Sequence, residues 1–193
     1  MGGYPPERRL LATAALTAVL VLTACTPQPP PGSTLPGPVP DGVVYHEIDA
    51  AAYPDAPDAE VTLLDGTTVA LSKLWSDRPV LLFFTESWCE QCIDAQRELN
   101  SVVEEYGDAV TVVAVSERGE VDGLTDYARE NDVTHLVARD PGGQAWRSYA
   151  ITEPPFLAVI GPGGTLVRGW RGVIEDLDGA VQALLVERMP SAE

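Results

Sequence analysis

The chain has 193 residues, with 12 basic and 29 acidic side chains and a formal net charge of −17. Hydrophobic residues make up 45 % of it, which is typical of a globular protein and not of a disordered one. So acidic a chain argues against a nucleic-acid-binding protein, because phosphate contacts need clustered Lys and Arg.

The first twenty-four residues predict a signal peptide. Arg8 and Arg9 precede Leu10–Ala24, a run of fifteen residues without a charge. A spanning helix needs roughly 20 apolar residues, whereas a basic start followed by an apolar core of about 7–15 residues has the shape of a signal peptide. No second run is long enough to span a bilayer, which excludes a multi-span transporter.

The end of this run resembles a bacterial lipoprotein signal, because it reads Leu22-Thr23-Ala24-Cys25. The resemblance implies that Cys25 is acylated, becomes the first residue of the mature protein and anchors it on the extracytoplasmic face of the cell membrane. A secretory signal with a chance cysteine is the alternative. The segment Pro27–Pro40 holds seven prolines and no charge, and such a sequence favours extended polyproline II at ~3.1 Å per residue. We therefore expect residues 25–40 to form a tether and residues 41–193 to form the folded domain.

Strand and helix patterns alternate along the expected domain. Val61–Leu64 and Thr67–Leu71 flank Asp65-Gly66, which predicts a β-hairpin. Continuous apolar runs predict buried strands, and apolar residues spaced by three or four predict helices. The further expected elements are a helical turn at 72–75 capped by Ser72, a strand at 79–85, a helix from about 92 to 106, a strand at 109–115, a helix at 124–130, a strand at 134–138, a short helix at 146–149, strands at 155–160 and 165–170, and a helix at 177–189. This order predicts an α/β fold with a mixed central sheet, helices on both faces and an N-terminal β-hairpin.

The candidate chemistry lies in Trp88-Cys89-Glu90-Gln91-Cys92, where a buried strand meets the start of a helix. The N–H groups and the dipole at a helix N-terminus stabilise a thiolate, which favours Cys89 as a nucleophile. Cys89 would attack the disulfide of a partner, and Cys92 would resolve the mixed disulfide. A structural disulfide and half of a zinc site are the alternatives. Zinc would need a second pair of ligands, and the mature domain has no further cysteine, so we expect no metal and no cofactor.

Over roughly residues 57–189 the chain resembles the thioredoxin superfamily, in particular the extracytoplasmic TlpA/ResA-like thiol–disulfide oxidoreductases. The matching segments are Ala56-Pro57, Leu64-Asp65-Gly66 with Leu71-Ser72, Phe84 to Cys92, Tyr149-Ala150-Ile151, Pro154-Pro155-Phe156, Gly163-Gly164 and Gly172. The resemblance implies a thioredoxin-like fold, a redox-active Cys89–Cys92 disulfide and a cis Pro155 facing it. It also implies that partner polypeptides bind in a shallow groove lined by Trp88, Pro154, Pro155 and Gly172. The implied partners are protein thiols or disulfides, together with an exported or membrane-bound electron donor.

The sequence departs from this family near the motif. Phe83 stands where thioredoxin keeps a buried aspartate, and Ala95 stands where TlpA/ResA-like proteins commonly have a glutamate. Thr85-Glu86 replaces a common Trp-Ala pair, so Glu86 and Glu90 are candidates for the carboxylate that handles protons or tunes the thiol pKa. The alternative is that both glutamates are solvated side chains. The resemblance therefore implies the general dithiol chemistry and leaves a role in cytochrome c maturation open.

Three further classes compete with a thiol–disulfide oxidoreductase. A peroxiredoxin would need Pro and Thr or Ser where Leu82 and Glu86 precede Cys89. A copper chaperone on the same fold would use two thiolates and an imidazole, but no histidine follows His135. A tethered binding module with an idle dithiol is the third. Reduction of insulin would distinguish the oxidoreductase from the copper chaperone and the binding module, and a copper titration would distinguish these two from each other.

Overall fold

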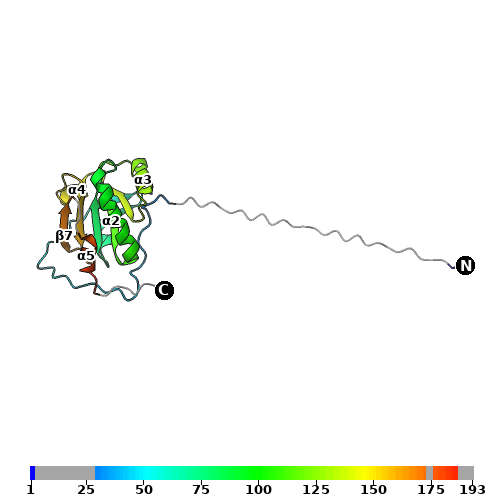
Figure 1. Ribbon diagram of the computed structural model, residues 1–193, viewed down its shortest axis with the longest axis horizontal. Helices are drawn as coiled ribbons and strands as arrows, with labels where there is room; N and C mark the ends of the chain where they lie inside the picture. Colours follow the sequence, from blue (N-terminus) through cyan, green and yellow to red (C-terminus); the bar gives the residue numbers. More distant parts are fainter. Residues whose placement is uncertain (3–28, 173–175, 187–193) are drawn as a thin grey trace.

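A single mixed sheet of seven strands, in the order β2-β1-β5-β4-β3-β6-β7, organises the described part of the protein (Figure 1). The computed structural model describes residues 1–2, 29–172 and 176–186. The parallel strands at the centre are β3 (Val80–Phe84), β4 (Thr111–Ser116) and β5 (Leu136–Arg139). On one side, β6 (Phe156–Ile160) and β7 (Leu166–Arg171) continue the sheet in antiparallel fashion. Cys25, residues 3–24 of the predicted signal peptide and residues 187–189 of the predicted last helix lie outside the described residues.

The predicted hairpin closes the other side of the sheet. It consists of β1 (Glu60–Leu63) and β2 (Thr68–Ala70), which pair antiparallel, and β1 also pairs antiparallel with β5. The turn is stabilised by Asp65, whose Oδ1 accepts the N–H of Thr67 at 2.8 Å, and by Gly66, whose φ of 89° favours glycine. The hairpin is therefore confirmed where the Asp-Gly pair predicts it.

Both faces of the sheet are covered by helices, as predicted. One apolar core lies beneath α2 (Glu90–Tyr106), α3 (Val121–Glu130) and α5 (Leu177–Gln182). The core on the opposite face includes residues of α1 (Leu71–Leu74) and α4 (Gln144–Ser148). Because side chains alternate along a strand, Leu81 and Phe83 belong to the first core, and Leu82 and Phe84 belong to the second. The fully buried β3 therefore fixes the position of the segment that follows it, which carries the two cysteines.

Two details of the helices differ from the sequence-based expectation. Ala70, not Ser72, is the N-cap of α1, and the N–H of Ser72 donates to Oδ1 of Asp58 at 2.8 Å. The expected capping role of Ser72 is wrong because Asp58, fourteen residues earlier, satisfies this end of the helix from outside. α5 ends at Gln182, earlier than the apolar spacing of the C-terminal segment suggests.

The proline-rich residues 31–40, called the strap from here on, contact the domain. The N–H of Val137 donates to the carbonyl oxygen of Gly32 at 2.8 Å, and the N–H of Gly37 donates to Oδ1 of Asp108 at 3.1 Å. In Figure 1 the blue N-terminal segment runs along the outside of the domain. Val137 lies near the start of β5 and Asp108 lies just before β4. The strap therefore lies at the N-terminal edge of the parallel strands, whereas Cys89 follows the C-terminal end of β3.

Candidate active site

Cys89 is the N-cap residue of α2, and its position gives its sulfur a hydrogen-bond donor. The N–H of Cys92 donates to Sγ of Cys89 at 3.2 Å. The N–H of Cys89 itself donates to the carbonyl oxygen of Glu86 at 3.0 Å, which closes the turn between β3 and the helix. An N-cap sulfur with a backbone donor at the positive end of a helix dipole is suited to carry negative charge.

A disulfide joins Cys89 and Cys92, whose Cα atoms lie 5.3 Å apart. Cys92 is fully buried within the first turn of α2, while Cys89 remains 6 % exposed and lines an open groove. A partner can therefore approach the sulfur of Cys89 and not that of Cys92. This asymmetry matches the predicted roles, with Cys89 as attacking thiol and Cys92 as resolving thiol.

The groove beside Cys89 has a volume of about 470 Å³. Its wall includes Trp88, which is 64 % exposed although tryptophan is usually largely buried, and Pro154 from the segment before β6. The other lining residues are Glu90, Gln91 and Glu153. Of the four residues expected to line a groove for partner polypeptides, the structure thus brings Trp88 and Pro154 directly to Cys89.

Pro155 and Gly172, the other two residues expected in the groove, are hydrogen-bonded to each other. The Pro154–Pro155 peptide bond is cis, as the resemblance implies. Pro155 is buried, and its carbonyl oxygen accepts the N–H of Gly172 at 3.0 Å. Within the described ranges, neither residue is among those that line the groove. The hydrogen bond instead ties the end of β7 to the segment that carries Pro154.

The two candidate carboxylates occupy different environments. Glu90 is exposed in the first turn of α2 and lines the groove beside Cys89. Glu86 is only 2 % exposed, and its carboxylate accepts three hydrogen bonds, from the hydroxyl of Ser116 and from the N–H groups of Glu117 and Arg118. Glu86 is therefore buried and hydrogen-bonded, which contradicts the alternative that it is a solvated side chain.

Ser116 and Glu153 take part in the site although the sequence analysis did not single them out. A signal for Ser116 exists, since it ends a strand of otherwise apolar character at the edge where parallel sheets carry their functional groups. Glu153 immediately precedes the proline pair. No sequence signal separates it from the other exposed acidic residues.

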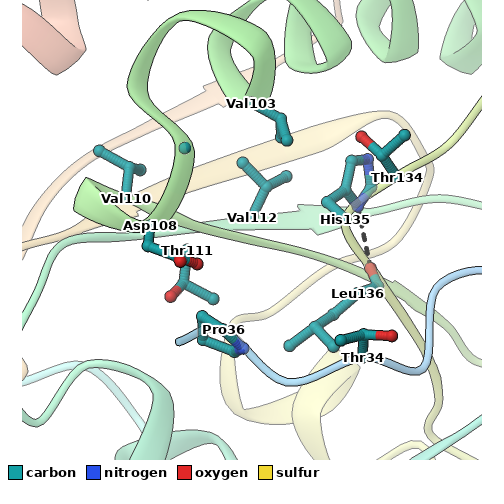
Figure 2. A pocket seen from close by; sticks show the side chains of 11 residues that line it. Thr34, Pro36, Val103, Asp108, Val110, Thr111, Val112, Thr134, His135 and Leu136 are labelled. Atoms are coloured by element: carbon teal, nitrogen blue, oxygen red, sulfur yellow. Dashed lines mark hydrogen bonds between the residues drawn. The ribbon is translucent and has the colours of Figure 1, made fainter. Parts of the chain in front are cut away.

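The two histidines are not part of the site around the cysteines. His135 is buried between β5 and α2, where its Nε2 lies 2.6 Å from Nε2 of Gln96 and its Nδ1 lies 2.9 Å from the carbonyl oxygen of Leu136. Because a carbonyl oxygen only accepts, Nδ1 carries the proton and Nε2 accepts from the amide of Gln96. Burial lowers the pKa of His135 to about 4. Figure 2 shows this side chain lining a pocket of about 210 Å³ that also includes Thr34 and Pro36 of the strap.

No group of three or more His, Cys, Asp and Glu side chains in the described ranges is arranged to hold a metal ion. None of the helices described is both long and apolar enough to cross a membrane.

The profile of the AhpC/TSA family matches residues 54–174, which is more than half of the chain and includes both cysteines of the motif. The chain belongs to the AhpC/TSA family. Among the relatives of this AhpC/TSA member, a thioredoxin-like protein of Haemophilus influenzae is 30 % identical over 125 residues, covering 63 % of this chain and 74 % of the relative. A thiol-disulfide oxidoreductase ResA of Oceanobacillus iheyensis is 30 % identical over 128 residues, covering 65 % of each chain.

Solved structures similar to this AhpC/TSA member confirm the thioredoxin-like fold. A protein from Chlorobium tepidum, assigned as a thiol:disulfide interchange protein DsbE, has a TM-score of 0.60 at 25 % identity, covering 67 % of this chain and 92 % of its own. The exposed lipoprotein thioredoxin Etrx1 of Streptococcus pneumoniae has a TM-score of 0.57 at 28 % identity, covering 66 % of this chain and all 100 % of its own. With its dithiol pair at a helix N-terminus, the protein is a thiol–disulfide oxidoreductase.

Proposed function

We propose that this oxidoreductase is lipid-anchored outside the cytoplasm and reduces or exchanges disulfides of protein partners through Cys89 and Cys92. The observation that carries the proposal is the asymmetry of the two sulfurs. Cys89 accepts a helix N-terminal N–H at 3.2 Å and borders a groove large enough for a polypeptide segment, whereas Cys92 is fully buried. Trp88 and Pro154 supply apolar surface on which a polypeptide can lie.

In the reducing direction, the thiolate of Cys89 attacks one sulfur of the partner disulfide. The partner's S–S bond breaks, its other sulfur leaves as a thiolate that takes up a proton, and a mixed disulfide with Cys89 forms. The sulfur of Cys92 then loses its proton and attacks Sγ of Cys89, which releases the second partner thiol and forms the Cys89–Cys92 bond. Two electrons and two protons pass to the partner. A dithiol donor, exported or held in the membrane, restores the reduced pair by the reverse exchange.

Trapping of mixed disulfides tests the two roles. We expect Cys92→Ser to accumulate mixed disulfides through Cys89, because the attacking thiolate remains and its resolving partner is gone. Cys89→Ser should accumulate few, because Cys92 is buried. Non-reducing electrophoresis after incubation with insulin measures both variants, and equal trapping would contradict the assignment.

The proposed anchor is Cys25, with the residues before the strap as its link to the domain. The support is the tetrapeptide Leu22-Thr23-Ala24-Cys25, together with the similarity to a solved structure that is itself named an exposed lipoprotein. We expect Cys25→Ala to leave the membrane fraction or to retain its signal, because each buried methylene of an acyl chain contributes ~0.8 kcal/mol of membrane binding. Cys92→Ser is the control and should fractionate like the wild type. An unchanged mass and fractionation of Cys25→Ala would contradict the lipoprotein assignment.

Glu86 and Glu90 are proposed to tune the dithiol. A like charge within ~4–6 Å disfavours ionisation, so negative carboxylates near Cys89 oppose its thiolate. A less stable thiolate makes the reduced pair less stable, which lowers the reduction potential and favours the protein as a reductant. This is the reason for proposing the reducing direction.

A further inference from the structure

The carboxylate of Glu86 connects two loops at the C-terminal edge of the sheet. Its Oε1 accepts the N–H groups of Glu117 and Arg118, at 3.0 and 2.9 Å, and its Oε2 accepts the hydroxyl of Ser116 at 2.8 Å. Its own carbonyl oxygen accepts the N–H of Cys89. One buried residue thus binds the start of the cysteine turn through its backbone and the loop after β4 through its side chain.

Ser116 extends the connection to a third loop. Its Oγ accepts the N–H of Gly119 at 2.8 Å while it donates to Glu86, and its carbonyl oxygen accepts the N–H of Asp140 at 2.8 Å. A Cβ at Gly119 would lie 2.5 Å from Oγ of Ser116, so only glycine fits this close turn. The loop Glu117–Gly119 is therefore held in one position by a hydrogen-bonded network with Glu86 as its principal acceptor.

The strand order places this loop beside the segment that leads from β3 to the cysteines. β3 lies between β4 and β6, so the cysteine turn after β3 is flanked by the segment of Pro154 on the β6 side and by the loop Glu117–Gly119 on the β4 side. The side chain of Arg118 is 75 % exposed at this position. The loop is not part of the groove lined by Pro154, so a polypeptide would reach it only by extending past the sulfur of Cys89 toward β4.

We propose that Glu86 is a positioning residue that holds the loop Glu117–Gly119 in place. This loop forms the wall on the β4 side of the surface next to Cys89 where partner polypeptides bind. The inference deepens the proposed function and rests on it. Glu86 acts here through its acceptor oxygens and not through its charge. A neutral amide can replace it for this purpose, since one carbonyl oxygen can accept both main-chain N–H groups.

The test compares a protein disulfide with a small one. The full chain, chemically reduced, is mixed with insulin or with the aromatic disulfide DTNB, and the ratio of the two second-order rate constants is measured. DTNB needs Cys89 but no extended binding surface, so any change in thiolate reactivity or in the folded fraction affects both rates and cancels in the ratio. We expect Glu86→Gln to keep the ratio within about two-fold and Glu86→Ala to lower it about ten-fold, because the alanine leaves the N–H groups of Glu117 and Arg118 without the acceptor that holds the loop.

Ser116→Ala provides a second variant that keeps both main-chain hydrogen bonds to Glu86 and loses only the hydroxyl. It should lower the ratio about three-fold, and it decides the question if Glu86→Ala does not fold. A ratio lowered as much by Glu86→Gln as by Glu86→Ala would overturn the inference, because the glutamine keeps an acceptor oxygen for both main-chain N–H groups. Unchanged ratios in Glu86→Ala and Ser116→Ala would overturn it as well, while leaving the proposed function intact. A wild-type chain that reduces DTNB and not insulin would instead overturn the proposed function and this inference with it.

Discussion

The two edges of the parallel strands bury polar side chains in opposite ways. At the C-terminal edge, Glu86 accepts the N–H groups of Glu117 and Arg118 in the loop after β4, and Asp140 accepts the N–H groups of Gln144 and Trp146 at the start of α4. At the N-terminal edge, His135 is held neutral by burial and by the amide of Gln96. Both edges satisfy the rule that buried polar groups are hydrogen-bonded. They differ in what covers them.

The two edges differ in whether a partner can reach them from solvent. The C-terminal edge is open at the groove beside Cys89, where Trp88 is exposed. The N-terminal edge is overlaid by the strap, which contributes Thr34 and Pro36 to the pocket in Figure 2. Burial of a titratable group therefore does not by itself mark a functional site. What distinguishes the reactive edge is a nucleophile at a helix N-terminus next to open surface.

The largest effect should come from the titration of His135 at the closed edge. Its folded pKa is about 4 and its ordinary value is 6.5, so between these values the unfolded chain binds a proton that the folded chain does not. Stability is therefore fully present above pH 6.5 and falls as the pH drops toward 4. We expect the free energy of unfolding to fall by about 1.5 kcal/mol between pH 6.5 and 5, measured by urea denaturation.

His135→Gln isolates this contribution, because glutamine does not titrate and still offers a carbonyl oxygen to Gln96. The pH dependence between 6.5 and 5 should become flatter in this variant, whatever its absolute stability. His46→Gln is the matched control, since His46 is the other histidine and is exposed. If His46→Gln loses the pH dependence and His135→Gln keeps it, the loss of stability at low pH does not come from protonation of the buried His135.

A smaller effect should follow from releasing the strap. Gly32 has a φ of 78°, and a Cβ there would lie 2.7 Å from Cγ2 of Val137 and 3.1 Å from its backbone nitrogen. Gly42 has a similar φ of 84°, but a Cβ there meets nothing within 4 Å. Gly32→Ala and Gly42→Ala therefore share the backbone strain and differ in the overlap. We expect Gly32→Ala to be less stable by about 1 kcal/mol than Gly42→Ala in urea denaturation.

Limited proteolysis measures directly whether the strap is released. If Gly32→Ala releases the strap, a protease should cleave this variant faster near residues 31–40. The rates of insulin and DTNB reduction should stay unchanged, because the strap lies at the edge away from Cys89. Equal cleavage of the two alanine variants would mean that the contacts of Gly32 with Val137 do not hold the strap in place.

The sequence predicts the framework of the reactive edge better than its details. Apolar runs and the Cys-x-x-Cys spacing are local signals, and they correctly place the buried β3, the helix after it and the N-terminal hairpin. The environment of Glu86 depends on β4 becoming the neighbour of β3, so it is a long-range property that no local pattern reveals. The same holds for the strap, since its proline content predicts an extended conformation and says nothing about the surface on which it lies. The hydrogen bond from the N–H of Ser72 to Asp58 also joins residues that are distant in the sequence, so the local pattern around Ser72 does not reveal it.

The smallest effect concerns the exposed charge at the open edge. Glu90 lies in the first turn of α2 and borders the groove with Cys89, so its carboxylate opposes the Cys89 thiolate, while solvent and salt screen the repulsion. Glu90→Gln should stabilise the thiolate and hence the reduced form, which raises the reduction potential. A change equivalent to less than one pKa unit corresponds to less than about 30 mV for this two-electron couple. Equilibration with a glutathione buffer at low and high salt measures the shift, which should shrink at high salt.

Glu104→Gln is the matched control for this measurement, because Glu104 is also exposed on α2 but lies fourteen residues further on, about 21 Å along the helix axis. Its replacement should leave the potential unchanged at either salt concentration. We expect the wild-type potential to lie near the ~−270 mV of thioredoxin and well below the ~−120 mV of a strong oxidant. A wild-type value near the oxidant, or a Glu86→Gln/Glu90→Gln double variant with the wild-type potential, would contradict the proposed tuning and remove the reason for assigning the reducing direction.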